Sequence, residues 1–342
     1  MRLNWRLLAG LLVATVSSCT IGQVPSNNIV ERLHQAEIEN SIDGPDMKPW
    51  HLKMSFQTFA GKGITKDQGA IEEWWAPGKH RITITSGEYT GTELQNEQGR
   101  FLTTGVGSIP YRLEALLNGA VHPLPTPASV GATKPELMKE TIAKVPMDCL
   151  MLTEEVGLKM QAAPIGMFPT YCMFRGTNQL IFSFSPGSET VVLNRMGKFA
   201  GHAVAVELTL QNDDIVVAKA HVDALSSSAS DIGDFTTTTG LDDANAPAPN
   251  VDQKTMEGYL VTRPNPIYPE SAKRAHVSGA VILRAVIGRD GRIRRLRVQS
   301  APDAALAMAA LQAVRQWVFK PYLLNGVPTE AVSVVTVNFT FG

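Results

Sequence analysis

Alternation of apolar and polar residues is the feature that most constrains how this chain of 342 residues folds. From Trp50 to Gln57 every second side chain is apolar, and the same alternation returns in His202–Gln211 and Ile215–Leu225. Successive side chains of a strand point to opposite faces of a sheet, so this pattern is typical of strands with one buried face. Turn residues such as Pro77-Gly78 separate the strands at intervals of about ten residues, which favours an antiparallel meander. We therefore predict one large antiparallel β domain over residues 50–225.

Helical patterns accompany the predicted strands at three places. A helical period of apolar residues lies around Val30–Asn40, ahead of the first strand. Two more helical segments, Ile109–Asn118 and Lys134–Lys144, interrupt the strands. We therefore expect the β domain to carry a helical insert.

The first residues have the composition of an export signal. Arg2 and Arg6 supply positive charge, and Leu7–Val16 is an apolar run of ten residues. A membrane-spanning helix needs about 20 apolar residues, whereas this length fits the apolar core of a signal peptide. We predict a signal peptide over residues 1–19, a polar and partly helical lead over residues 20–49, and a periplasmic location.

The end of this signal, Val16-Ser17-Ser18-Cys19, resembles the lipobox of bacterial lipoproteins. The resemblance implies that Cys19 is lipidated and becomes the mature N-terminus, which would anchor the protein to a membrane. Cleavage without a lipid and an uncleaved signal anchor are the two alternatives that the sequence leaves open.

Two cysteines, Cys149 and Cys172, remain outside the signal region. Cysteines of exported proteins are usually bridged, because the compartment is oxidising. We therefore predict a disulfide between them, and two buried free thiols are the alternative.

Residues 226–257 differ in composition from the segments on either side. They are rich in Ser, Thr, Asp, Ala and Pro, and their large apolar residues are few and scattered. Such a segment cannot bury enough apolar surface to compensate for its ordering. We predict a flexible linker with a reach of roughly 30 Å, so the C-terminal domain is expected to be tethered to the β domain and not docked on it.

Residues 258–342 are predicted to form a small separate domain. Apolar residues alternate from Val281 to Ile287, and Asp290-Gly291 then supplies a hairpin turn, because glycine tolerates positive φ at little cost. Asp303 is a candidate N-cap for the helix that follows, and Val332–Phe339 alternates again as a last strand. The predicted element order is therefore ββαβ.

This segment resembles the C-terminal domain of TonB-family proteins. The resemblance rests on the order and spacing of Tyr268, Pro269, Gly279, Asp290, Gly291, Trp317, Phe319 and Pro321. We interpret Trp317 and Phe319 as core residues that seal the helix onto the sheet.

In the TonB family the edge of the last strand takes a short box peptide of an outer-membrane transporter or receptor. An unpaired strand edge accepts an extended segment through backbone hydrogen bonds. Carried over to this chain, the resemblance implies a partner-binding strand made of Val332, Ser333, Val334, Val335, Thr336, Val337, Asn338 and Phe339. The alternative is an edge blocked by a neighbour, by dimerisation or by the domain's own N-terminal segment.

The predicted β domain resembles the half-barrel of periplasmic lipoprotein carriers and receptors. This resemblance rests on the order of the elements, the opening "WHLKMSFQTF" and the export signal. It implies an apolar cleft for an acyl chain, with Met54, Phe56, Trp74, Trp75 and Phe182 as candidate lining residues. The alternative is a sheet whose concave face is simply a packed core.

The sequence carries little that points to an enzyme. The seven histidines are scattered without metal-ligand spacing, and adjacent Glu72 and Glu73 should point to opposite faces of a strand. A net charge of -1 gives no basis for nucleic-acid binding. We therefore expect no catalytic residue, no metal and no cofactor.

Taken together, the predicted fold is α+β, with a large half-barrel-like antiparallel domain followed by a small ββαβ domain. The expected function is that of a cell-envelope protein of the TonB family, linked to transport. Its partner would be an outer-membrane TonB-dependent transporter or receptor, or another envelope protein, and the alternative is a lipid carrier. The segment between the two domains contains only Pro247 and Pro249, so it lacks the long Pro-rich spacer of energy-transducing members, which argues against direct force transduction.

Overall fold

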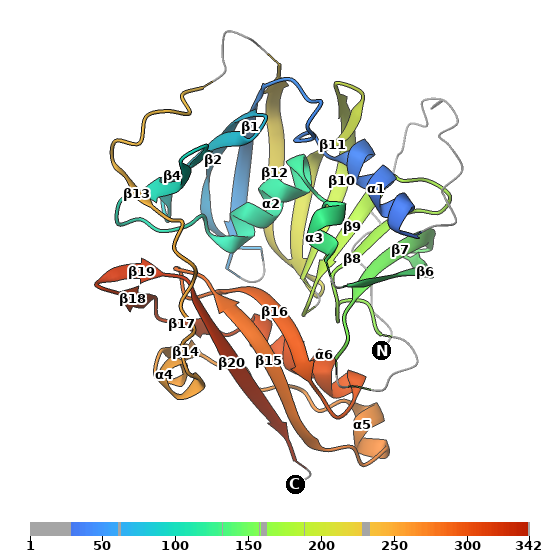
Figure 1. Ribbon diagram of the computed structural model, residues 1–342. Coiled ribbons are helices and arrows are strands. Elements are labelled where there is room, and N and C mark those ends of the chain that lie inside the picture. The colour runs from blue at the N-terminus through green and yellow to red at the C-terminus, as the bar shows by residue number, and fades with distance from the viewer. Residues whose placement is uncertain are drawn as a thin grey trace.

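A single antiparallel sheet of thirteen strands dominates the computed structural model (Figure 1). The structure describes residues 29–60, 63–131, 133–156, 158, 163–187, 189–227 and 233–340. In spatial order the strands are β13 (Leu241–Asp243), β5 (Gly99–Thr103), β4 (Thr90–Asn96), β3 (Lys79–Ser86), β2 (Thr65–Ala76), β1 (Trp50–Phe59), β12 (Ile215–Ser226), β11 (His202–Asn212), β10 (Glu189–Phe199), β9 (Leu180–Ser185), β8 (Thr170–Phe174), β7 (Val145–Thr153) and β6 (Lys134–Ile142). The predicted large antiparallel sheet is confirmed.

Three helices cover one face of this sheet: α1 (Ile29–Asn40), α2 (Tyr111–Val121) and α3 (Pro127–Val130) (Figure 1). Leu113, Leu116 and Leu117 recur on one side of α2 and are buried against the sheet. Arg32 of α1 donates a hydrogen bond to Asp148 of β7 at 2.9 Å, and both side chains are buried. The helices therefore fill the curve of the sheet with a packed core.

Lys134–Lys144 was predicted as a helix, and this prediction is wrong. The segment forms strand β6, which pairs with β7 from Lys134↔Thr153 to Ile142↔Val145. Its residues favour a helix intrinsically, but β7 is apolar and offers a long edge, so pairing overrides local propensity. The other two predicted helices correspond to α1 and α2.

The predicted disulfide between Cys149 and Cys172 is confirmed, with an Sγ–Sγ distance of 2.03 Å. The two residues lie directly opposite each other on β7 and β8. This bond closes the loop between two neighbouring strands and holds the β6–β9 part of the sheet.

Glu72 and Glu73 lie on opposite faces of β2, as their adjacent positions in a strand predict. Glu72 accepts from His51 at 3.3 Å, while Glu73 is only 4% exposed on the helix-covered face. Burial raises the pKa of Glu73 to about 7, since the charged form loses its hydration. The two carboxylates therefore cannot act as a pair.

The C-terminal domain has the predicted ββαβ core. Its sheet has the order β16 (Ile293–Ser300), β15 (Gly279–Ile287), β20 (Ala331–Phe339), and helix α6 (Ala304–Arg315) packs against one face. Asp303 caps α6 by accepting from the backbone N–H groups of Ala305 and Leu306. Smaller elements complete the domain: α4 (Gln253–Glu257), β14 (Leu260–Thr262), α5 (Glu270–Arg274), β17 (Val318–Phe319), β18 (Tyr322–Leu324) and β19 (Val327–Thr329). The α+β fold class with a small C-terminal domain is confirmed.

The prediction of a flexible linker over residues 226–257 is wrong for its described part. Residues 241–243 form β13, which pairs with β5, and Pro249 and Val251 pair with β20. Residues 253–257 form α4. The segment is ordered by backbone hydrogen bonds to two sheet edges, which need few apolar side chains.

Residues 1–19, with the predicted signal peptide and Cys19, lie outside the described residues, as do residues 228–232 of the predicted linker. Among the helices that the structure describes, none combines the length and the apolar character needed to cross a membrane.

Candidate functional site

The outer edge of the C-terminal sheet is the candidate site. Strand β20 pairs with β15 on one side, in a register from Gly279↔Phe339 to Ile287↔Ala331. On its other side the N–H of Val332 donates to the oxygen of Pro249 at 2.9 Å. In an antiparallel strand the N–H and C=O of one residue point the same way, and the direction alternates along the chain. Val334, Thr336 and Asn338 therefore present their backbone groups away from β15.

All eight residues of the predicted partner-binding strand lie in β20. Ser333, Val335, Val337 and Phe339 are buried on the α6 side, whereas Val334 is 38% exposed and Asn338 is exposed. An added strand would thus meet backbone groups at the edge and the side chains of the other four residues on the outer face.

The residues of the TonB-like motif shape the sheet and do not line its edge. Tyr268 donates from its hydroxyl to the oxygen of Val277 at 2.5 Å, and its ring packs edge-on against Phe339. Pro269 directly precedes helix α5, and Gly279 is the first residue of β15, directly opposite Phe339. These contacts fix the C-terminal end of β20.

The remaining motif residues lie around the hairpin and the end of α6. Gly291 has φ +74°, and a side chain there would collide with the oxygen of Phe319, so only glycine fits. Trp317 donates from Nε1 to the oxygen of Pro264 at 3.1 Å, and Trp317 and Phe319 are both buried. Asp290 accepts from the N–H of Arg292 within the turn, and Pro321 follows β17. The predicted core role of Trp317 and Phe319 agrees with this packing.

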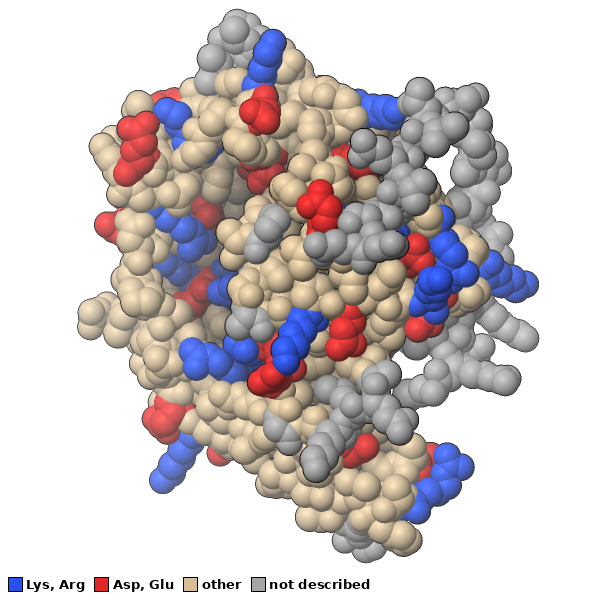
Figure 2. Space-filling model, turned by 45° about the vertical axis from the view of Figure 1, so that its right-hand side comes forward, with Lys and Arg blue, Asp and Glu red and all other residues tan. Residues whose placement is uncertain are grey.

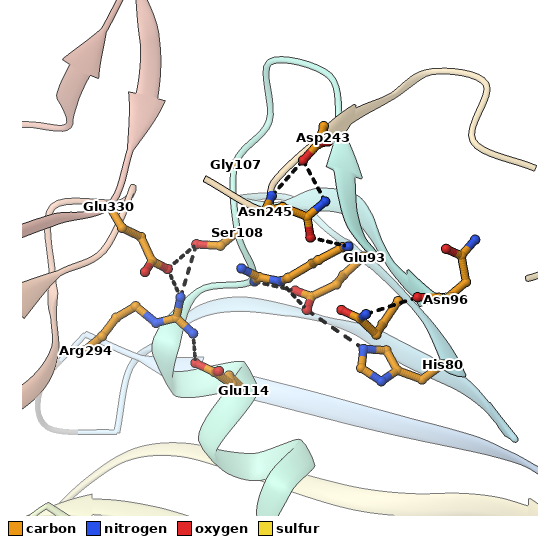
Figure 3. Close-up of polar contacts among 12 residues, drawn as sticks. His80, Glu93, Asn96, Gly107, Ser108, Glu114, Asp243, Asn245, Arg294 and Glu330 are labelled. Atoms are coloured by element: carbon orange, nitrogen blue, oxygen red, sulfur yellow. Dashed lines mark hydrogen bonds and ion pairs between the residues drawn. The ribbon is translucent and has the colours of Figure 1, made fainter. Parts of the chain in front are cut away.

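A part-buried arginine holds the start of β20 against the large sheet. Arg294 of β16 reaches Glu330, the residue before β20, and also Glu114 of α2 (Figure 3). Its side chain is 12% exposed. One guanidinium thus joins a carboxylate of each domain, and this contact holds the first residues of β20 in place relative to the large sheet.

A second arginine, Arg315 at the end of α6, is fully inserted between the domains. It donates to the oxygen of Pro186 at 2.6 Å and lies over the ring of Tyr111 at 5.4 Å. Apolar contacts add to this, since Met151, Met167 and Phe168 pack into the core of the C-terminal domain. The expectation of a tethered, undocked domain is therefore wrong.

The charge of the chain divides unevenly between its parts. Residues 258–342 contain eleven Lys and Arg against four Asp and Glu, a net charge of +7, while the whole chain carries -1. Charged side chains of both signs are scattered over the face drawn in Figure 2 and form no single large patch there. The C-terminal domain is thus basic overall.

A groove of about 1400 Å³ runs across the large sheet. Its apolar part includes Met147, Phe174, Ile181 and Phe182, and its polar part includes Lys219 and His221. Among the predicted cleft residues, Phe56 and Phe182 line this groove.

The other predicted cleft residues do not line the groove. Met54 and Trp75 are buried in the core under the helices, and Trp74 stacks on His51 at 4.4 Å. The face under the helices is therefore a packed core in this region.

The edge strand, the ββαβ order and the motif residues together define a small, separate C-terminal domain. Residues 264–341 match the family model described as "Gram-negative bacterial TonB protein C-terminal". The predicted resemblance of the C-terminal domain to TonB C-terminal domains is confirmed.

Among curated proteins, the chain is similar to Protein TonB of Vibrio cholerae, with 29% identity over 93 residues. The match covers 25% of this chain and 38% of that protein, so it spans well under half of the relative.

Two solved structures align with more than half of the chain. A LolA superfamily protein from Nitrosomonas europaea has 13% identity and a TM-score of 0.39, with 58% of this chain and 93% of that chain covered. A DUF1329 family protein from Desulfovibrio piger has 8% identity and a TM-score of 0.37, with 59% and 91% covered.

Sequence reasoning missed Arg294, Glu330 and the segment around Val251. Arg294 stands in the run "RIRRLR", where several arginines look alike, and only the fold brings one of them between two carboxylates. The segment around Val251 contributes backbone groups, which leave no pattern in side chains.

Replacing Arg294 by methionine should loosen the attachment of the C-terminal domain. The substitution leaves Glu114 and Glu330 without their shared cation in a part-buried setting, so the free energy of unfolding should fall by about 2 kcal/mol or more. Urea unfolding followed by tryptophan fluorescence measures this change. The matched control is Arg295→Met, since Arg295 is exposed, and it should change stability by less than about 0.5 kcal/mol. Equal effects of the two substitutions would contradict the role of Arg294.

Proposed function

We propose that this chain is a non-enzymatic cell-envelope protein whose C-terminal domain binds an extended peptide of an envelope partner. The peptide adds as a strand to the β20 edge. The observation that carries the proposal is the outward direction of the backbone groups of Val334, Thr336 and Asn338. Within the described part of the chain, β15 is the only strand that pairs with β20 along its length.

Binding of a peptide to such an edge is expected to be weak, because few backbone hydrogen bonds hold it. Each net backbone hydrogen bond contributes about 0.5–1.5 kcal/mol, and ordering the peptide opposes this gain. Affinity then depends on the number of paired residues, and the sequence preference is loose, because the backbone is common to all peptides.

The partner that fits best is an outer-membrane TonB-dependent transporter or receptor. Support comes from the TonB C-terminal family match and from the basic charge of the domain. A positive domain speeds encounter with an acidic segment and disfavours basic competitors. In this proposal the protein is exported to the periplasm by residues 1–19, and Cys19 is either lipidated or removed with the signal.

Replacement of Val334 by proline tests the proposal directly. Its N–H faces the open edge, so proline removes a donor to the partner and leaves the ladder with β15 intact. A box-like peptide from an outer-membrane transporter of the same cell should bind the Val334→Pro protein at least about tenfold more weakly, since a hydrogen bond is lost and the ring crowds the edge. Isothermal titration of the full chain measures this affinity.

The control for that experiment is Val334→Ala, which keeps the N–H and changes only the exposed side chain. Its affinity should stay within about threefold of the unmodified protein, as expected for recognition through the backbone. Unchanged binding to the proline variant would place the peptide elsewhere on the molecule.

A lipid carrier is the second candidate function, and the groove across the large sheet supports it. The groove combines apolar residues with the cation Lys219, while Arg195 in the same groove is paired with Glu207 at 3.0 Å, so an acyl chain with an anionic head group near Lys219 would fit it. Mass spectrometry of an organic extract of the purified protein tests this candidate. Recovery of about one lipid per protein is the expected result, and a lipid-free extract would exclude the carrier function.

A further inference from the structure

The chain immediately before the C-terminal domain already occupies one end of the β20 edge. The N–H of Val251 donates to the oxygen of Val332 at 2.8 Å, and the N–H of Val332 donates to the oxygen of Pro249 at 2.9 Å. Asn250 and Val332 form a parallel bridge. We call residues 249–253 the strap.

The strap has a side-chain contact farther along the strand. The hydroxyl of Thr336 donates to Oε1 of Gln253 at 2.9 Å. Asp252, the residue before Gln253, caps helix α4. Met256 of α4 is buried in the core of the domain. The strap thus covers Val332 through its backbone and reaches Thr336 through one side chain.

A second anchor holds the strap from the other side. The oxygen of Arg100 on β5 accepts from the N–H of Ala244 at 2.8 Å, and Asn245 accepts from the N–H of Arg100 at 2.9 Å (Figure 3). Only residues 246–248 separate this anchor from the strap. A short tether of this kind keeps the strap at a high effective concentration beside β20.

The strap and an added partner strand require the same atoms. Pairing along all of β20 uses the outward N–H and C=O of Val332, which the strap holds. With the strap in place, a partner can pair only from Val334 to Asn338, which leaves it three of the four residues whose backbone groups face outward.

We propose that the strap is an intramolecular competitor that the partner peptide must displace to pair along the whole of β20. This inference rests on the proposed function. The apparent affinity for a partner is reduced by the fraction of molecules in which the strap is released. Loss of one strap hydrogen bond should therefore tighten peptide binding by roughly three- to tenfold.

The test compares Val251→Pro with Val251→Ala in the full chain. Proline removes the N–H that bonds Val332, whereas alanine keeps it and shortens the side chain. The probe is the same box-like transporter peptide, with its dissociation constant measured by titration calorimetry. Val251→Pro should bind about three- to tenfold more tightly than the unmodified protein, and Val251→Ala should bind within about twofold of it.

Hydrogen exchange of the Val332 amide shows independently whether the strap has opened. Faster exchange in Val251→Pro with unchanged peptide affinity would overturn the competition while leaving strand addition standing. Faster exchange with no binding to either protein would show that the proposed function itself has failed, and the competition with it. Gln253→Ala is the second variant, because it removes only the Thr336 contact and should tighten binding in the same direction.

Discussion

An unpaired sheet edge is the constraint on which most of this structure depends. Backbone N–H and C=O groups at an edge have to find a partner or stay in water. This chain has a long edge at β5 and another at β20, and the segment between the domains pairs with part of both. A segment with few apolar residues is thus ordered by two sheets, and within the described residues the β20 edge has no paired strand from Val334 to Asn338.

Charge placement then decides how the two sheets face each other. Arg294 brings the carboxylates of Glu114 and Glu330 together, and Arg315 fills the space between Pro186 and Tyr111. Both arginines hold the β16 side of the small sheet against the large sheet. Because β20 lies on the opposite side of the small sheet, docking leaves its edge turned away from the β domain (Figure 1).

The elements that were predicted from the sequence are those whose own side chains carry a pattern. Alternation around Trp50 and His202 reveals strands because one face is buried, and Asp290-Gly291 reveals a hairpin because few residues tolerate that turn. The segment Lys134–Lys144 has strong helix formers, so only its pairing with β7 explains why it is a strand. The strap and the domain contact were missed for a related reason, since their partners are distant in sequence and largely backbone.

The candidate edge followed from a family resemblance together with the open side of a three-stranded sheet. The pairing of the strap with Val332 could not be predicted from the sequence. Nothing in "PNVDQ" distinguishes a segment that pairs with a strand from one that is exposed to solvent. The alternative of an edge blocked by the domain's own N-terminal segment fits Val332, while Val334, Thr336 and Asn338 keep their outward direction. Strand β20 is therefore blocked by the strap at Val332 and, in the described part of the chain, open to a partner strand from Val334 to Asn338.

The measurement that tests the central claim most directly is a nuclear magnetic resonance titration of the full chain with the transporter peptide. Strand addition requires that the amides of Val334, Thr336 and Asn338 shift and become protected from exchange, because their N–H groups gain acceptors. Shifts confined to the groove residues, such as Phe182 and Lys219, or no shifts at millimolar peptide, would contradict binding at the β20 edge.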